Sequence, residues 1–456
     1  MSKHGQQRGG RSSRQDPWTK KPAPQQHTTP PQAPQPPQAR RPQWAQPETS
    51  QAPQAPQATR PLVTNTSTID LDVHKNGGVP RARREPPPGQ EEKRQVSGRD
   101  RYLDLLRALA LLRVVVYHTF GWAWLTLVFP SMGVMFALAG SLMARSLNRP
   151  ALKVIKSRVR RLLPPLWLFG AFALTVLIAV QGWRPGLDVV RWLVPIGAPP
   201  FPWDIGSKGG LLEDTWALQA AGPLWYLRAY LWFVLLSPLL LWAFRRVPWL
   251  TLLAPLALTA LIDTKVLTIP GETGEAVKDF AVYGSCWVLG FAHRDGLLKK
   301  LPGYVVPSLA PFVMIAGAWW ANGHLGPDGW DLNDIPLGQA LWSFGFCLLL
   351  LHFSPSWEKL PGALARFDKV ITLANNRAVT IYLWHEIALM ATVPIIDRLW
   401  NIDAIGDSPT WSKVLEQGDA TIMFILVWPL LAILIAAFGW AEDVAAKRRP
   451  RLFPMK

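Results

Sequence analysis

Beyond Arg101 the chain is a series of apolar runs separated by polar connections. Ten runs can be distinguished, each close to the roughly 20 residues that a helix needs to cross a bilayer. They lie at 102–124, 128–147, 162–181, 223–244, 249–269, 277–293, 304–321, 336–353, 370–397 and 420–441. Because a backbone in lipid must satisfy its own hydrogen bonds, each run is predicted to be a helix. The pattern predicts an all-α, polytopic transmembrane helix bundle of about ten spans within residues 99–441.

Two of these runs fit the pattern less well than the others. The sixth is short, and the ninth contains Pro394, which is expected to break its helix. The count of ten therefore depends on how these two segments fold.

Residues 1–98 have a different composition, with repeated Pro-Gln-Ala units such as PQAPQPPQAR. Such a segment cannot bury enough apolar area to offset its ordering entropy, so it is predicted to be a disordered cytoplasmic tail with polyproline II character. A solvated tail is the simpler interpretation, and a docking ligand for a partner protein is the alternative. The segment contains no apolar stretch typical of a cleavable signal peptide.

The net charge of +17 suggests a nucleic-acid partner at first, but its distribution favours a membrane protein without one. With a cytoplasmic N-terminus, the even-numbered connections and the basic C-terminal segment 442–456 carry most of the Lys and Arg of the membrane part. This bias matches the positive-inside rule, and it predicts that both termini are cytoplasmic. The expected location is the plasma membrane, with membrane lipids around the spans. The two cysteines, Cys286 and Cys347, cannot form a disulfide framework or a CxxC zinc site.

Ionisable residues inside a span are costly and indicate function. In the first span, Arg107 and His118 are eleven residues apart, which places them about 20° from each other on a helical wheel. Asp104 falls about 60° to the other side of Arg107, so the three share one face along about 21 Å of helix. Arg113 lies on another face and is expected to pair with a neighbouring helix.

Structural explanations compete with a catalytic one for each residue of this face. Asp104 and Arg107 lie near the end of the span, where they could snorkel to the surface or form an i,i+3 pair. His118 lies too deep to snorkel, although it could simply form a hydrogen bond between helices.

A second basic cluster, KSRVRRLLPP at 156–165, opens the third span. Arg158 and Arg161 share a helix face, while Arg160 points elsewhere. The cluster could serve only to fix the orientation of the spans in the membrane. Two converging guanidinium groups also form a fork suited to phosphate oxygens. Pro164 and Pro165 are expected in the first turn of the helix, where proline is tolerated.

The ninth span contains TIYLWHEIAL, in which His385 and Glu386 are adjacent. Neighbouring residues face about 100° apart, and HExxH is absent, so no metal is predicted. A carboxylate in mid-span needs a partner, which for Glu386 could be an arginine of the bundle or His118. Arg228, near the outer end of the fourth span, is expected to snorkel.

These residues together resemble the membrane-bound acyltransferase 3 family. Its hallmarks are an Arg, ten residues and a His in the first span, as in Arg107 and His118, and an Arg-x-x-Arg before Pro in the third, as in Arg158 and Arg161. An Asp three residues before the first Arg, here Asp104, is also common. Further similar segments are GVMFALAGSLM, GPLWYL and YLWHE. Where many glycan-acetylating members carry an acidic pair, this chain has Arg228-Ala229-Tyr230.

The resemblance implies a membrane O-acyltransferase that moves an acyl group, typically acetyl, from cytoplasmic acyl-CoA to a hydroxyl of a cell-surface carbohydrate or glycolipid. It implies that Arg158 and Arg161 bind acyl-CoA and that His118 is the general base. Arg107, Asp104 and Glu386 complete the expected catalytic group, without a metal. Two other classes stay open: a transporter or flippase that uses the buried charges as its path, and a silent sensor or scaffold that acts through the Pro-rich tail.

Overall fold

The computed structural model describes residues 100–180, 182–193, 195, 197 and 215–455. The chain divides into two units between Glu85 and Pro86, and all described residues belong to the second. The predicted disordered tail 1–98 lies outside the described residues.

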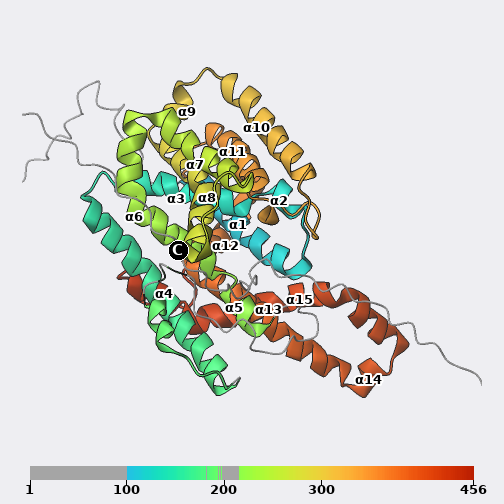
Figure 1. The fold of residues 1–456 in the computed structure, drawn as a ribbon. Helices are drawn as coiled ribbons and strands as arrows, with labels where there is room; N and C mark the ends of the chain where they lie inside the picture. Colours follow the sequence, from blue (N-terminus) through green and yellow to red (C-terminus); the bar gives the residue numbers. More distant parts are fainter. Residues whose placement is uncertain (1–99, 181, 194, 196, 198–214, 456) are drawn as a thin grey trace, which may run out of the picture. The chain divides into compact units, whose positions relative to one another are not determined.

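Helices make up most of the described part of the chain, in which no strand occurs (Figure 1). The α-helices are α1 Arg101–Phe120, α2 Leu125–Val128, α3 Ser131–Ser146, α4 Ala151–Ala179, α5 Trp216–Ala221, α6 Leu224–Arg246, α7 Pro248–Asp263, α8 Gly271–Arg294, α9 Leu297–Lys300, α10 Val305–Asn322, α11 Pro336–His352, α12 Asp368–Asn376, α13 Ala378–Trp400, α14 Asp403–Gly406, α15 Pro409–Phe438 and α16 Trp440–Ala445. Three 3₁₀ helices are η2 Leu187–Trp192, η3 Leu332–Asp334 and η4 Gly362–Phe367. The predicted all-α fold is confirmed.

Nine of the ten predicted spans lie largely on one helix each and the ninth is divided between α12 and α13, and several segments are long and apolar enough to cross a bilayer. Among the described residues six segments meet both conditions: Leu125–Ser146, Ala151–Ala179, Trp216–Arg246, Val305–Asn322, Ala378–Trp400 and Gly418–Phe438. The apolar helices α7 and α11 are shorter. Helices α1 and α8 are not among these six segments, and charged residues are distributed along them.

The ninth predicted span, 370–397, is interrupted at a different place from the one expected. Helix α13 continues through Pro394, whereas the break falls at Arg377, between α12 and α13. A proline removes one backbone hydrogen bond, and a bundle of surrounding helices tolerates that loss. At Arg377 the backbone leaves helical geometry, with φ −118° and ψ 23°, and the side chain is fully buried.

The third predicted span also begins earlier than expected. Helix α4 starts at Ala151, so Pro164 and Pro165 lie near its middle rather than in its first turn. Apolarity marks only the part of a helix that is in lipid, and the basic residues before Leu162 extend the same helix out of it. Arg158 and Arg161 therefore sit on a regular, continuous helix.

Helices α3 and α8 pack closely against each other at two glycines. A Cβ at Gly140 would lie 2.1 Å from the carbonyl oxygen of Trp287, and one at Gly290 would lie 2.2 Å from that of Ala137. Small residues of this kind let helix backbones approach within a bundle. Helix α1 packs on α3, α12 and α13, which brings the first span against the ninth and positions the site described next.

Candidate active site

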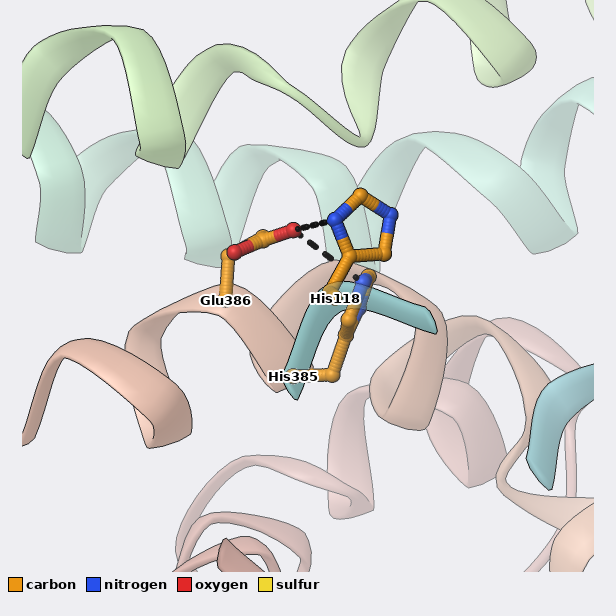
Figure 2. A group of neighbouring side chains, drawn as sticks. All are labelled: His118, His385 and Glu386. Atoms are coloured by element: carbon orange, nitrogen blue, oxygen red, sulfur yellow. Dashed lines mark ion pairs between the residues drawn. The ribbon is translucent and has the colours of Figure 1, made fainter. Parts of the chain in front are cut away.

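His118 and Glu386 form a close pair between α1 and α13. His118 lies in the last turn of α1, and its Nδ1 is 2.7 Å from Oε1 of Glu386 in the middle of α13 (Figure 2). The Glu386 side chain is 7% exposed and that of His118 is 38% exposed. Of the two partners considered for Glu386, the structure therefore shows His118.

The proton positions in this pair follow from the chemistry of the two groups. An ionised carboxylate only accepts hydrogen bonds, so a neutral His118 paired with it donates through Nδ1–H. Its Nε2 then carries the lone pair and can accept a proton from a substrate. The carboxylate holds the ring in this tautomer and stabilises the imidazolium that forms after proton transfer, as an acid residue does in hydrolase triads.

His385 joins this pair from the same turn of α13. Its Nδ1 donates to the carbonyl oxygen of Tyr382 at 2.7 Å, which leaves Nε2 as the unprotonated nitrogen of the neutral ring. That Nε2 is buried, forms no hydrogen bond with the described residues and lies 3.5 Å from Oε1 of Glu386. The rings of His118 and His385 are 5.1 Å apart.

The three side chains also resemble a set of metal ligands (Figure 2). Their ligand atoms all lie within 4.8 Å of one another, and three protein ligands are what a catalytic zinc site supplies. His385 and Glu386 are adjacent in the sequence, which argued against a metal, but the fold brings His118 beside them. The absence of a metal therefore stays a prediction, and the 2.7 Å contact has the geometry of a hydrogen-bonded His–carboxylate pair.

Asp104 and Arg107 form a second group, nearer the start of α1. Asp104 is buried and pairs with Arg101 at 3.0 Å, and its other oxygen is 3.9 Å from Arg107. Arg107 also donates to the side-chain oxygen of Asn375 at 2.8 Å. The helix face predicted to carry Asp104, Arg107 and His118 is thus divided between two groups of partners. Asp104 holds Arg107 in place.

A cavity of about 510 Å³ lies beside this second group. Four arginines line it, Arg107 from α1, Arg158 and Arg161 from α4, and Arg448 from the segment after α16. Glu442 contributes the one carboxylate of its described lining, and Asn375 and Asn376 contribute amides. The structure therefore brings both predicted acyl-CoA residues together with Arg107. With four guanidinium groups and one carboxylate, the cavity is suited to an anion.

The two arginines of α4 differ in their surroundings. Arg158 donates through Nη2 to Oγ of Ser146 at 2.9 Å and to the carbonyl oxygen of Leu142 at 3.3 Å. Arg161 forms no hydrogen bond or ion pair with another described residue. Its guanidinium group is therefore available for a ligand.

Tyr382 connects the cavity with the histidine pair. Its side chain lines the cavity, and its carbonyl oxygen accepts the hydrogen bond of His385 one turn further along α13. A ligand in the cavity is thus separated from Glu386 by a short stretch of α13.

Glu442 is the unusual carboxyl of the cavity. Its Oε1 accepts hydrogen bonds from both the backbone N and the Oγ1 of Thr380, each at 2.6 Å. Burial raises the pKa of Glu442 to about 7, and this effect outweighs the opposing hydrogen bonds of Thr380 and the charges of Arg377 and Arg448. Glu442 therefore changes charge near neutral pH.

Sequence reasoning did not identify several polar lining residues, namely Asn375, Asn376, Glu442 and Arg448. Arg448 belongs to a basic KRR sequence that is typical of a topology signal. Asn375 lies within the ninth predicted span but is uncharged, and Glu442 directly follows the tenth, so neither is a charge inside an apolar run. Their signal is spatial and appears only when α12, α13 and α16 are placed together.

Two other charged residues have structural partners. Arg113 lies over the ring of Tyr117, 4.6 Å from its centroid, and donates to the carbonyl oxygen of Leu125 at 3.4 Å. Arg228 was expected to snorkel, which is wrong. It is 5% exposed and pairs with Asp279 of α8 at 2.6 Å, because the two helices place both charges at the same level.

Comparison with known proteins adds one finding to this geometry. A protein-family model described as an acyltransferase domain matches residues 100–441. No curated protein and no solved structure matched the chain. The match spans both α1, with its histidine, and α4, with its arginines.

Proposed function

The chain belongs to the acyltransferase 3 family, and from this premise we propose that it transfers an acyl group from cytoplasmic acyl-CoA to a hydroxyl of a cell-surface carbohydrate or glycolipid. One observation carries the proposal. A His–Glu pair suited to general-base catalysis is formed between α1 and α13, and both helices also supply residues to the wall of an arginine-lined cavity. The chain is a multi-pass membrane protein and, as a member of this family, an acyltransferase.

The proposed reaction uses His118 as the general base. Its Nε2 removes the proton of the acceptor hydroxyl while that oxygen attacks the carbonyl carbon of the thioester. The C–S bond then breaks, and the imidazolium returns the proton to the departing CoA sulfur. Glu386 stabilises the positive ring between these two steps, and its burial strengthens that interaction. A covalent acyl-His118 intermediate is a variant of the same scheme.

The cavity supports acyl-CoA as the donor. CoA carries several phosphate groups, and guanidinium groups bind phosphate oxygens through paired, charge-assisted hydrogen bonds. Arg158 and Arg161 would hold the phosphates, with Arg107 further along toward His118. The acyl group would be acetyl, as in many members of the family, and no metal takes part.

The arrangement of basic residues supports a plasma-membrane protein with cytoplasmic termini. On this orientation the arginine cavity opens to the cytoplasm, where acyl-CoA is made, and His118 lies toward the outer side, where the acceptor is. The Pro-rich tail would remain cytoplasmic, where it could bind a protein partner.

Acyl transfer can be tested with purified full-length protein in lipid nanodiscs. We expect CoA release from acetyl-CoA that increases with added acceptor glycolipid. Mass spectrometry of surface glycans and lipids from a deletion strain should show the loss of one acyl group and identify the acceptor. Net transport of a lipid-linked substrate across vesicles, with no CoA release, would contradict the proposal and favour a flippase.

The affinity for the donor should depend on Glu442. Below its pKa of about 7, Glu442 is neutral, and the cavity loses its negative charge beside Arg107, Arg158, Arg161 and Arg448. We therefore expect CoA to bind about fivefold more tightly at pH 6 than at pH 8. Calorimetry across this range measures the change.

Glu442→Gln provides the comparison for this pH dependence. The variant keeps an oxygen that accepts from Thr380 but has no charge, so it should bind tightly at both pH values. Titration of the CoA phosphates affects both proteins equally and cancels in their ratio. A pH profile of Glu442→Gln identical to that of the unsubstituted protein would show that another group is responsible.

A further inference from the structure

The segment that follows α16 turns back and supplies a residue to the cavity. The backbone N of Lys447 donates to the carbonyl oxygen of Val444 at 2.9 Å, and the backbone N of Arg448 donates to the carbonyl oxygen of Asp443 at 2.7 Å. This pair of hydrogen bonds is a Schellman motif, which ends a helix through a residue in the left-handed conformation. Lys447 occupies that position with φ 58°, a conformation that is unfavourable for a residue other than glycine.

Strong contacts hold the returning segment on the junction between α12 and α13. The fully buried Arg377 pairs with Asp443 at 2.6 Å and also donates to the carbonyl oxygen of Arg451. The backbone N of Arg451 donates to Asp443 at 3.1 Å, and Asn376 donates to the carbonyl oxygen of Pro454 at 2.9 Å. The course of the segment is therefore fixed at several points on either side of Arg448.

Arg448 keeps much of its binding capacity in this position. Its Nη2 lies 3.2 Å from Asp443 and its Nη1 lies 3.5 Å from the side-chain oxygen of Asn376, while 46% of its side chain is exposed. A guanidinium group has five N–H donors, so others remain for a ligand. Asp443 is shared with Arg377, so one carboxylate faces two guanidinium groups and the cluster retains a net positive charge.

We propose that Arg448 is a phosphate-binding residue of the donor site, which makes the segment after α16 part of the acyl-CoA site. This inference rests on the proposed function. Arg448 lines the same cavity as Arg158 and Arg161, and its positive charge repels that of Arg161. CoA carries a pyrophosphate and a separate phosphomonoester, so more than two guanidinium groups can bind it at once. The turn at Lys447 reverses the chain and so places Arg448 at the cavity.

The test compares CoA binding by purified full-length Arg448→Ala and Arg449→Ala. Arg449 is the matched control, because it is the next residue, exposed and basic, and does not line the cavity. We expect Arg448→Ala to raise the Kd for CoA about tenfold and the KM for acetyl-CoA similarly, with kcat at saturation within twofold. Arg449→Ala should stay within twofold of the unsubstituted protein. Arg448→Lys, which keeps the charge without the fork, should lie between the two.

The other outcomes are distinct. A protein that binds no CoA at all would refute the proposed function. If Arg161→Ala weakens CoA binding but Arg448→Ala and Arg449→Ala both leave it unchanged, the role of Arg448 is overturned while the proposed function stands. A lower melting temperature and a lower kcat for Arg448→Ala, with KM unchanged, would also overturn it, since they indicate that Arg448 only anchors the segment.

Discussion

Replacing His118 by alanine is expected to lower kcat for acyl transfer by about 10²- to 10⁴-fold, the usual contribution of a general base. The imidazole is the group that the structure holds ready for proton transfer, with its Nδ1 fixed by Glu386 at 2.7 Å. The Kd for CoA should change little, because His118 lies outside the lining of the arginine cavity. Rates of CoA release and Kd values from the same membrane preparation measure both quantities.

Glu386→Gln tests the same pair from its other side. The amide oxygen can still accept from Nδ1 but carries no charge, so the imidazolium loses its stabilisation. We expect kcat to fall by about a hundredfold, typical for the loss of one electrostatic contact in an active site.

His324→Ala is the control for both variants, because His324 is exposed and bonded only locally, to the carbonyl oxygen of Trp320. It should retain activity within twofold. Activity of His118→Ala within a few-fold of the unsubstituted protein would exclude the general-base role.

Removing both Arg158 and Arg161 is expected to raise the KM for acetyl-CoA and the Kd for CoA by about 10²- to 10⁴-fold. Each guanidinium–phosphate contact contributes roughly 1.5–3 kcal/mol, and two are lost. The kcat at saturating donor should change much less, because neither residue contacts His118 or Glu386 in the structure. Steady-state kinetics with acetyl-CoA separates the two parameters.

The single variants and a neighbouring control separate binding from folding. Arg158 bonds to Ser146, so its replacement also disturbs the contact between α3 and α4, whereas Arg161→Ala removes no such contact among the described residues. Arg160 lies between them, is exposed and does not line the cavity. Arg160→Ala should therefore keep normal affinity. An equal loss in Arg160→Ala and Arg161→Ala would indicate a general effect of surface charge and contradict a specific phosphate site.

Much of the fold was predictable because lipid restricts the backbone to helices. Every predicted span is helical over most of its length, and the errors concern where helices start and break. Pro394 lies inside α13, and α4 begins at Ala151, eleven residues before its apolar run. Hydrophobicity indicates which residues contact lipid, whereas the ends of a helix depend on caps and on tertiary contacts such as those of Arg377.

The site was predictable only in its parts. A mid-span carboxylate needs a partner, so Glu386 could be singled out, but its pairing with His118 depends on how α1 packs on α13. The burial of Arg228 could not be predicted either, because its partner Asp279 lies on another helix. The contact of Arg448 with Asn376 joins residues 72 positions apart. Such contacts follow from packing and not from local pattern.

Helix α1 carries both Arg107 at the cavity and His118 at the pair with Glu386. Their eleven-residue separation spans about 16 Å along a rigid helix axis. On the proposed mechanism this helix fixes the distance between the phosphates of the donor and its reacting carbonyl group. The long pantetheine arm of CoA meets that requirement. A short donor such as acetyl phosphate has its carbonyl next to the phosphate. Bound at the arginine cavity, it could not reach His118.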